Sequence, residues 1–183
     1  PNGMTVNGFG VINGTHMTLQ GKDYIDIVGK GYGGQQIDST FITDHLRNRR
    51  SELWGHHLRI DTDTLENTGN IAAETMHISA KTMHNAGFVE SKDTLQFAGN
   101  ELVQDKGIMK ANQNVHISAH HIRNSNSSVL EAGTSVHITG DTLQNDASHV
   151  VSHGVMHLGV GNLENTNIGA IIAEDTLQIQ GNT

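Results

Sequence analysis

The sequence predicts an all-β fold, a right-handed parallel β-helix whose coils hold about 20 residues and three short strands each. Two observations predict it. One pattern recurs from residue 58 onward with a short, slightly variable period, and the apolar residues within each copy lie two apart, as Val115 and Ile117 do. Alternation with a period of two is typical of a half-buried strand. The period is also too short for the paired helices of tetratricopeptide or ankyrin repeats.

Each copy reads apolar-x-apolar, then about five residues, then Leu-x-Asn or an equivalent, and then a β-branched residue followed by small ones. Leucine-rich repeats have a similar period, but they need several leucines and a helical back, which these copies lack. Coils of a β-helix stack at the strand spacing of ~4.8 Å, so equivalent residues should form columns along the axis. The copies begin, the last one truncated, at Leu58, Met76, Leu95, Val115, Val136, Met156 and Leu177.

These starting residues form the first of three columns that we expect to point inward and build the core. The second column comes two residues later in each copy and holds Ile60, Ile78, Phe97, Ile117, Ile138, Leu158 and Ile179. The third column holds Leu65, Met83, Leu102, Ile122, Leu143 and Leu163.

A nearly continuous column of side-chain amides follows the third apolar column. Amides stacked in register can hydrogen-bond along the stack, and Asn also tolerates turn backbone conformations. A catalytic amide would occur once, whereas this one recurs in every coil, so we interpret the column as a structural ladder. Its members are Asn67, Asn85, Gln104, Asn124, Asn145 and Asn165.

Histidines are the candidate metal ligands, because the chain has 13 of them and no cysteine. The stretch VHISAHHIRN at residues 115–124 contains three, but strand alternation separates them onto different faces. The repeat instead places His116, His137 and His157 in one outward column. These are weak metal candidates, because the column offers no carboxylate, and we expect a solvated face without metal or cofactor.

Composition excludes several classes of function. Eleven Lys and Arg against nineteen Asp and Glu give a formal net charge of −8, which argues against a nucleic-acid partner. The one basic cluster, Arg47, Arg49 and Arg50, is too small to change this. No apolar run approaches the ~18 residues that span a bilayer. Because the chain starts at Pro1 without an initiator Met or a signal peptide, we expect its targeting segment to lie upstream.

The sequence does not predict an enzyme. It contains no GxSxG, HExxH or P-loop motif and no spacing typical of paired catalytic carboxylates. Residues 29–34 (GKGYGG) are glycine-rich, yet they lack the GK[ST] ending and no helical pattern follows them. We expect a loop or bulge there.

The repeats resemble the haemagglutinin repeats of filamentous haemagglutinin and related two-partner-secretion exoproteins, which include adhesins, haemolysins and contact-dependent inhibition toxins. PNGMTVNGFGVINGTHMTL at 1–19 is similar to the second signature of that family's secretion domain. IDSTFITDHLRNRRSELWGHHLRI at 37–60 resembles the later part of the domain, with a Leu-Trp dipeptide before the repeats. The family's cysteines are replaced by Val6 and Phe9, and Asn48 and Arg50 stand where its pattern is apolar.

The resemblance implies two regions: residues 1–57 as the C-terminal part of a secretion domain, and residues 58–183 as β-helix repeats continuous with it. It further implies export across the periplasm of a Gram-negative bacterium and through a partner outer-membrane β-barrel transporter, to a secreted or surface location. By motif match, Pro1, Asn2 and Gly3 are the candidates for transporter recognition. Pro-Asn-Gly also has the composition of an ordinary type I or II turn, and both interpretations hold together.

Two functions therefore remain from the sequence. The first is an export and rod-starting module of a large exoprotein. The second is an adhesive module that binds host or neighbouring-cell receptors through a solenoid face, or part of a secreted haemolysin. In either case the open end of a β-helix presents unpaired strands, so we expect the isolated chain to associate end to end.

Overall fold

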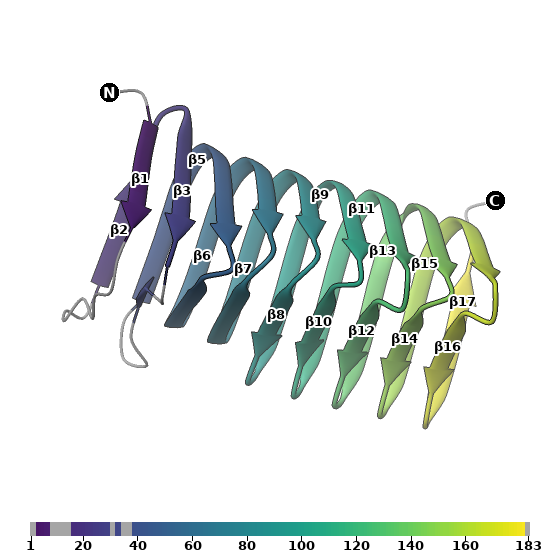
Figure 1. Cartoon of the computed structure of the whole chain (residues 1–183). Helices are drawn as coiled ribbons and strands as arrows, with labels where there is room; N and C mark the ends of the chain where they lie inside the picture. The colour runs from purple at the N-terminus through teal and green to yellow at the C-terminus, as the bar shows by residue number, and fades with distance from the viewer. Residues whose placement is uncertain (1–2, 8–15, 30–31, 34–37, 182–183) are drawn as a thin grey trace.

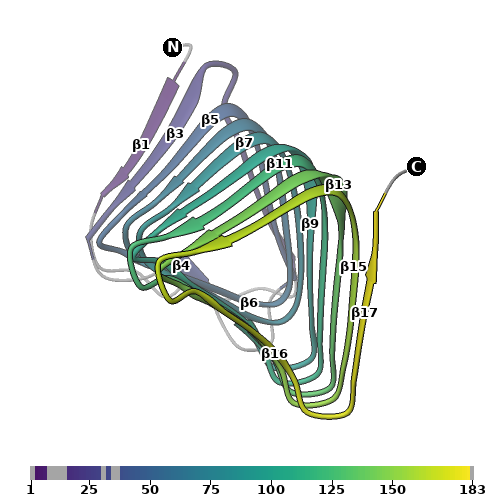
Figure 2. The same ribbon diagram turned by 90° about the vertical axis from the view of Figure 1, so that its right-hand side faces the viewer.

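The computed structural model describes residues 3–7, 16–29, 32–33 and 38–181. It is all-β, with 81% of residues in strands and about eight turns of a solenoid (Figure 1). Seen from the C-terminal end, the chain turns counter-clockwise as it approaches the viewer (Figure 2), which makes the β-helix right-handed. Both the fold class and its handedness confirm the prediction. Among the described residues there is no helix that could cross a bilayer.

All described pairings are parallel and join the strands into one sheet that winds around the axis. The strands are β1 (Gly3–Asn7), β2 (His16–Gln20), β3 (Tyr24–Val28), β4 (Tyr32–Gly33), β5 (Asp38–Arg49), β6 (Glu52–Asn67), β7 (Asn70–Asn85), β8 (Phe88–Ser91), β9 (Thr94–Asp105), β10 (Ile108–Ala111), β11 (Asn114–Ser125), β12 (Val129–Ala132), β13 (Ser135–Asp146), β14 (His149–Ser152), β15 (Val155–Thr166), β16 (Ala170–Ala173) and β17 (Thr176–Gln180).

Each coil has three faces, as predicted, but the first two faces belong to one strand that bends. Strand β11 pairs with β13 over residues 114–118 and again over residues 121–125, and the bend lies between the two segments. The short strand β12 forms the third face. In β6 and β7 the chain continues through the corner as well, so that each of these strands contributes to all three faces. The cross-section is therefore a triangle, which Figure 2 shows.

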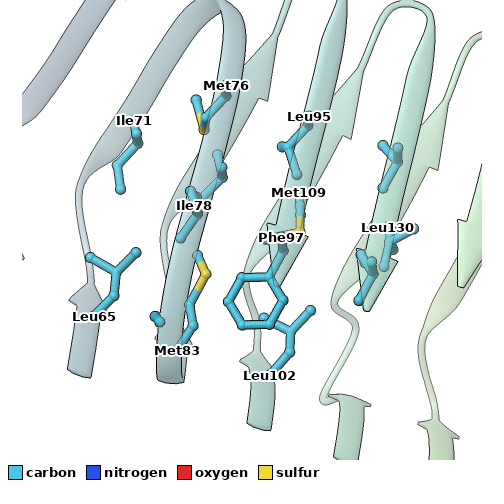
Figure 3. Packing of buried hydrophobic residues seen from close by; sticks show 14 of the residues in the cluster. Leu65, Ile71, Met76, Ile78, Met83, Leu95, Phe97, Leu102, Met109 and Leu130 are labelled. Carbon is cyan, nitrogen blue, oxygen red and sulfur yellow. The ribbon is translucent and has the colours of Figure 1, made fainter. Parts of the chain in front are cut away.

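The predicted columns match the register of the strands. Leu58 pairs with Met76 and Ile60 with Ile78, and the same registration continues through the later coils. Figure 3 shows Met76, Ile78 and members of the neighbouring coils in the interior, with Phe97 among methionines and aliphatic residues. A fourth inward column comes from the third face and contains Leu53, Ile71, Val89, Met109, Leu130 and Val150, all fully buried.

The ends of the inward columns differ from the expectation of a uniform core. Leu177 and Ile179 are 43% and 53% exposed, because β17 is the last described strand and no described coil covers it. At the other end the β-helix begins before residue 58, since β5 already pairs in parallel with β6, and Ser39 stands beneath Leu58. Because Ser39 is polar, the coil that contains it does not match the apolar pattern of the later repeats.

The amide column forms a hydrogen-bonded ladder, and it starts one coil earlier than the sequence pattern indicated. Asn48, fully buried, is its first rung. In each link the Nδ2 group of one rung donates to the side-chain oxygen of the next. The donor-to-acceptor distances are 2.8 Å for Asn48 to Asn67, 2.8 Å for Asn67 to Asn85, 3.1 Å for Asn85 to Gln104, 2.9 Å for Asn124 to Asn145 and 2.8 Å for Asn145 to Asn165.

The amides of the ladder also donate to backbone carbonyls. Nδ2 of Asn145 donates to the backbone carbonyl of Ser148 at 2.9 Å, and Nδ2 of Asn48 donates to that of Ser51 at 3.2 Å, so these two close the turn that leads to the third face. In Asn67, Asn85 and Asn124 the Nδ2 group donates instead to a carbonyl of the following coil. Because each Nδ2 carries two protons, one serves the ladder and the other a backbone carbonyl.

The ladder breaks between Gln104 and Asn124. Nε2 of Gln104 and Oδ1 of Asn124 are buried, and neither has a hydrogen-bond partner among the described residues. Gln is one methylene longer than Asn, and it occupies the coil in which the following turn grows by one residue, from two residues between Asn85 and Phe88 to three between Gln104 and Ile108. A buried polar group without a partner costs about 1–3 kcal/mol.

We expect the substitution Gln104→Asn to stabilise the protein by about 1–3 kcal/mol, because an Asn at this rung can reconnect the two halves of the ladder. The Asn145 rung shows that Asn is compatible with a turn of this length. Thermal and urea unfolding followed by circular dichroism measure the change. The exposed Gln178→Asn serves as the control, and equal or lower stability of the Gln104 variant would contradict the interpretation of the break.

Neighbouring coils approach closely at some glycines, and the stability of the protein should depend on the absence of a side chain there. A Cβ atom on Gly140 would lie 1.9 Å from the backbone oxygen of Ala119 in the preceding coil, whereas on Gly159 its nearest neighbour would be 3.6 Å away. We expect Gly140→Ala to destabilise the protein by about 1–3 kcal/mol, because the coils must separate at this corner. Gly159→Ala should change the unfolding free energy by less than about 0.5 kcal/mol. Equal midpoints of urea unfolding for the two variants would rule out this steric limit.

Candidate functional site

Outward histidines gather on the first face of the β-helix, and the register places them as the sequence predicted. His116 pairs with His137, which pairs with His157 in the next coil. Their ring centroids are 6.0 Å and 5.9 Å apart, with tilted planes. The pKa of His137 is lowered from its ordinary value of 6.5, first by partial burial and then by the neighbouring rings of His116 and His157. The column thus disfavours protonation of its middle ring.

The other two histidines of the VHISAHHIRN stretch lie elsewhere. His120 Nδ1 is 2.9 Å from Oδ2 of Asp141, and His121 Nδ1 is 3.0 Å from Oγ1 of Thr142. Each therefore has its own partner in the next coil. The three histidines of that stretch do not come together, in agreement with the expectation from strand alternation.

Another histidine, His153, lies between two carboxylates at the corner before the first face. His153 lies 2.8 Å from Glu174 through Nδ1 and 3.0 Å from Glu131 through Nε2. These hydrogen bonds raise the pKa of His153 above 6.5, and the bond to Glu174 has the larger effect. The three residues come from three successive coils, so they bridge the stack on its surface.

The most concentrated group of metal-ligating atoms was missed by the repeat pattern, because it lies before residue 58. Among the described residues, Asp38, His56 and His57 form the single group of three whose ligand atoms all lie within 4.8 Å of one another. Asp38 starts β5, and it pairs with His16 in β2 on one side and stands beside His57 of β6 on the other. His57, Asp38 and His16 form one column, each of them one residue before a member of the first inward column.

The chain conformation at the corner explains why two consecutive histidines point to the same carboxylate. Pairing of β6 with β7 skips one residue between Gly55 and His57, so His56 occupies the bend. The two imidazoles form an edge-to-face pair with centroids 4.1 Å apart. Strand alternation would have separated them onto opposite faces. An open groove of about 430 Å³ runs beside Asp38 and His57 along the first face.

The predicted transporter-recognition residues are only partly within the described structure. Pro1 and Asn2 lie outside the described residues. Gly3 begins β1, where it pairs with Tyr24 of β3. Their role in recognition stays a prediction from motif similarity.

Opposite pKa shifts predict an ordered titration of the surface histidines. The raised pKa of His153 means that its contribution to stability is present below pH 6.5 and is lost as pH rises through the folded-state pKa. For His137 the neutral ring is favoured, so its contribution is present above pH 6.5 and is lost as pH falls through the lowered pKa. Imidazole proton resonances followed by NMR should show His137 titrating at lower pH than His153.

Replacing the two carboxylates separates the causes of these shifts. In the double variant Glu131→Gln and Glu174→Gln, the pKa of His153 should fall toward 6.5, while that of His137 should not move. An unchanged titration of His153 in this variant would contradict the assignment of its partners.

The comparisons with known proteins identify no family for this chain. No family model, no curated protein and no solved structure matches it. The resemblance to two-partner-secretion exoproteins therefore remains an interpretation of the motifs at 1–19 and 37–60 and of the repeats.

Proposed function

We propose that this chain is the part of a secreted or surface-displayed exoprotein that serves export through a partner outer-membrane transporter and starts a β-helical rod. The observation that carries the proposal is the unbroken parallel register from β5 to β17. It is supported by the motif resemblance at 1–19 and 37–60. The β-helical rod is the observed fold, whereas its role in export is what we propose.

A β-helix suits export of an unfolded chain. Each coil contacts mainly the coils before and after it, so most contacts join residues about 20 positions apart, and each can form once the next coil has emerged. Asn67, for example, receives a hydrogen bond from Asn48 and donates one to Asn85. The amide of a newly emerged coil thus finds an oriented partner on the coil already folded. Folding outside the cell would then oppose backward movement of the chain.

A receptor-binding module is the second candidate, and one groove favours it. An open groove of about 530 Å³ lies at the third face beside Trp54, and it is lined further by Gly55, two alanines, Glu74, Glu90 and Lys92. Trp is among the residues most enriched at binding hot spots. Outward residues of the other faces are mostly polar, with Tyr24 and Ile42 partly exposed among them, so this groove is the stronger adhesive candidate.

Export and adhesion are separated by one experiment on the chain joined to an intact upstream secretion region. We expect Asn2→Ala and Gly3→Ala to reduce the secreted fraction at least tenfold when the partner transporter is expressed, because the recognised turn is changed. Gly159→Ala, remote from the motif and sterically tolerated, is the matched control. The amount of protein in the medium is compared with the amount retained in cells.

Binding of the purified secreted proteins to target cells tests the adhesive function. If Asn2 and Gly3 variants are exported normally, while Trp54→Ala abolishes binding to target cells, the adhesive function replaces the export function. If export falls and binding per molecule is unchanged, the export proposal is supported.

A further inference from the structure

We propose that Asp38, His56 and His57 form a binding site for a zinc-type divalent transition-metal ion at the first coils of the rod. Two imidazoles and one carboxylate are a ligand set that such ions accept, with solvent completing a tetrahedron. This inference is independent of the proposed export function. It rests on the side-chain geometry of the cluster and on the groups that surround it.

The separation of one nitrogen and one oxygen in the cluster is close to that of two ligands in a tetrahedral site. Nδ1 of His56 lies 3.5 Å from Oδ1 of Asp38, which is long for a nitrogen-to-oxygen hydrogen bond. Zinc bonds of about 2.0–2.1 Å place two ligands of a tetrahedron about 3.3 Å apart. The ligand atoms of all three residues already lie within 4.8 Å of one another. Small side-chain rotations would bring them to a common ion.

Each ligand also has a polar neighbour on the side away from the cluster, where outer partners of metal-bound side chains lie. Nε2 of His56 lies 3.4 Å from Oε2 of Glu74, so a carboxylate stands near the nitrogen opposite Nδ1. Nδ1 of His57 contacts Oγ1 of Thr75, which leaves Nε2 of that ring as its ligand atom. On the far side of the carboxylate, Oδ2 of Asp38 lies 3.6 Å from Nε2 of His16. Glu74 and Thr75 belong to β7 and His16 to β2, the flanking coils.

The other histidine clusters of the described residues lack this combination. The column of His116, His137 and His157 contains no carboxylate, and it is absent from the groups whose ligand atoms meet within 4.8 Å. His153 lies between two carboxylates in different coils, and with them it also makes no such group. These clusters serve as internal controls, because they have similar surface exposure and the same residue types.

An ion at this site would connect β5 and β6 and would be supported from β2 and β7. Ions that bind only the folded state stabilise it, and more so the tighter they bind. A bound ion would therefore strengthen the stacking of β6 on β5.

Isothermal titration of Zn²⁺ into the full chain, after removal of metal with EDTA and near pH 7.5, tests the site. We expect one ion per chain to bind with micromolar or tighter affinity. Asp38→Asn and His57→Gln should each weaken binding at least tenfold, while the control variants His137→Gln and His153→Gln should bind as the parent does. Circular dichroism in EDTA checks that every variant is folded.

Cobalt gives a second readout that does not depend on affinity. The parent with one equivalent of Co²⁺ should show the visible absorption bands of a four-coordinate site, and His56→Gln, a change at a half-exposed side chain, should remove them. Absence of a stoichiometric site in the parent would overturn the proposal. So would equal Zn²⁺ binding by the Asp38 and His57 variants, or loss of binding in the His137 or His153 control instead.

Discussion

The constraint on which the rest of the structure depends is the parallel register between coils, which places each residue directly on its equivalent one coil away. Every column must therefore hold side chains that tolerate their own neighbours at the ordinary strand spacing. Aliphatic columns satisfy this by packing, and the amide column satisfies it by hydrogen bonding, since an amide is both donor and acceptor. A column of one charge cannot, and in the column of His116, His137 and His157 the pKa of the middle ring is lowered, first by partial burial and then by its two neighbouring rings.

The same rule explains where chemically diverse groups gather. The inward columns and the amide column of the regular repeats contain similar residues, so they form uniform ladders. At the first coils the repeat is irregular, and one column brings His16, Asp38 and His57 together, with His56 added by the corner. Mixed donors in one column are what a metal site needs, whereas the uniform columns of the rod are what continued stacking needs.

Sequence alone predicted the fold and, from residue 58, the register of the inward and amide columns to the residue. The prediction failed at positions where the residue type within a column changes. Ser39 replaces an aliphatic residue below Leu58, so the earlier coils were not recognised as repeats, and with them Asn48 and the cluster around Asp38 were missed. The break at Gln104 was not predictable either, because it depends on side-chain length together with the turn that follows. Both failures concern contacts between coils that a periodic pattern treats as identical.

Side-chain contacts between coils add to the backbone pairing in the first described coils. Stability of such a stack is approximately a sum of coil and interface terms, so each contact between coils contributes to it. Arg49 lies 3.2 Å from Asp26, joining β5 to β3, and Arg47 lies 3.5 Å from Glu66, joining β5 to β6. Exposed ion pairs of this kind contribute only about 0–1 kcal/mol each. A bound ion with ligands from two coils would contribute more than either pair, and it would do so at the coils from which the remainder of the rod extends.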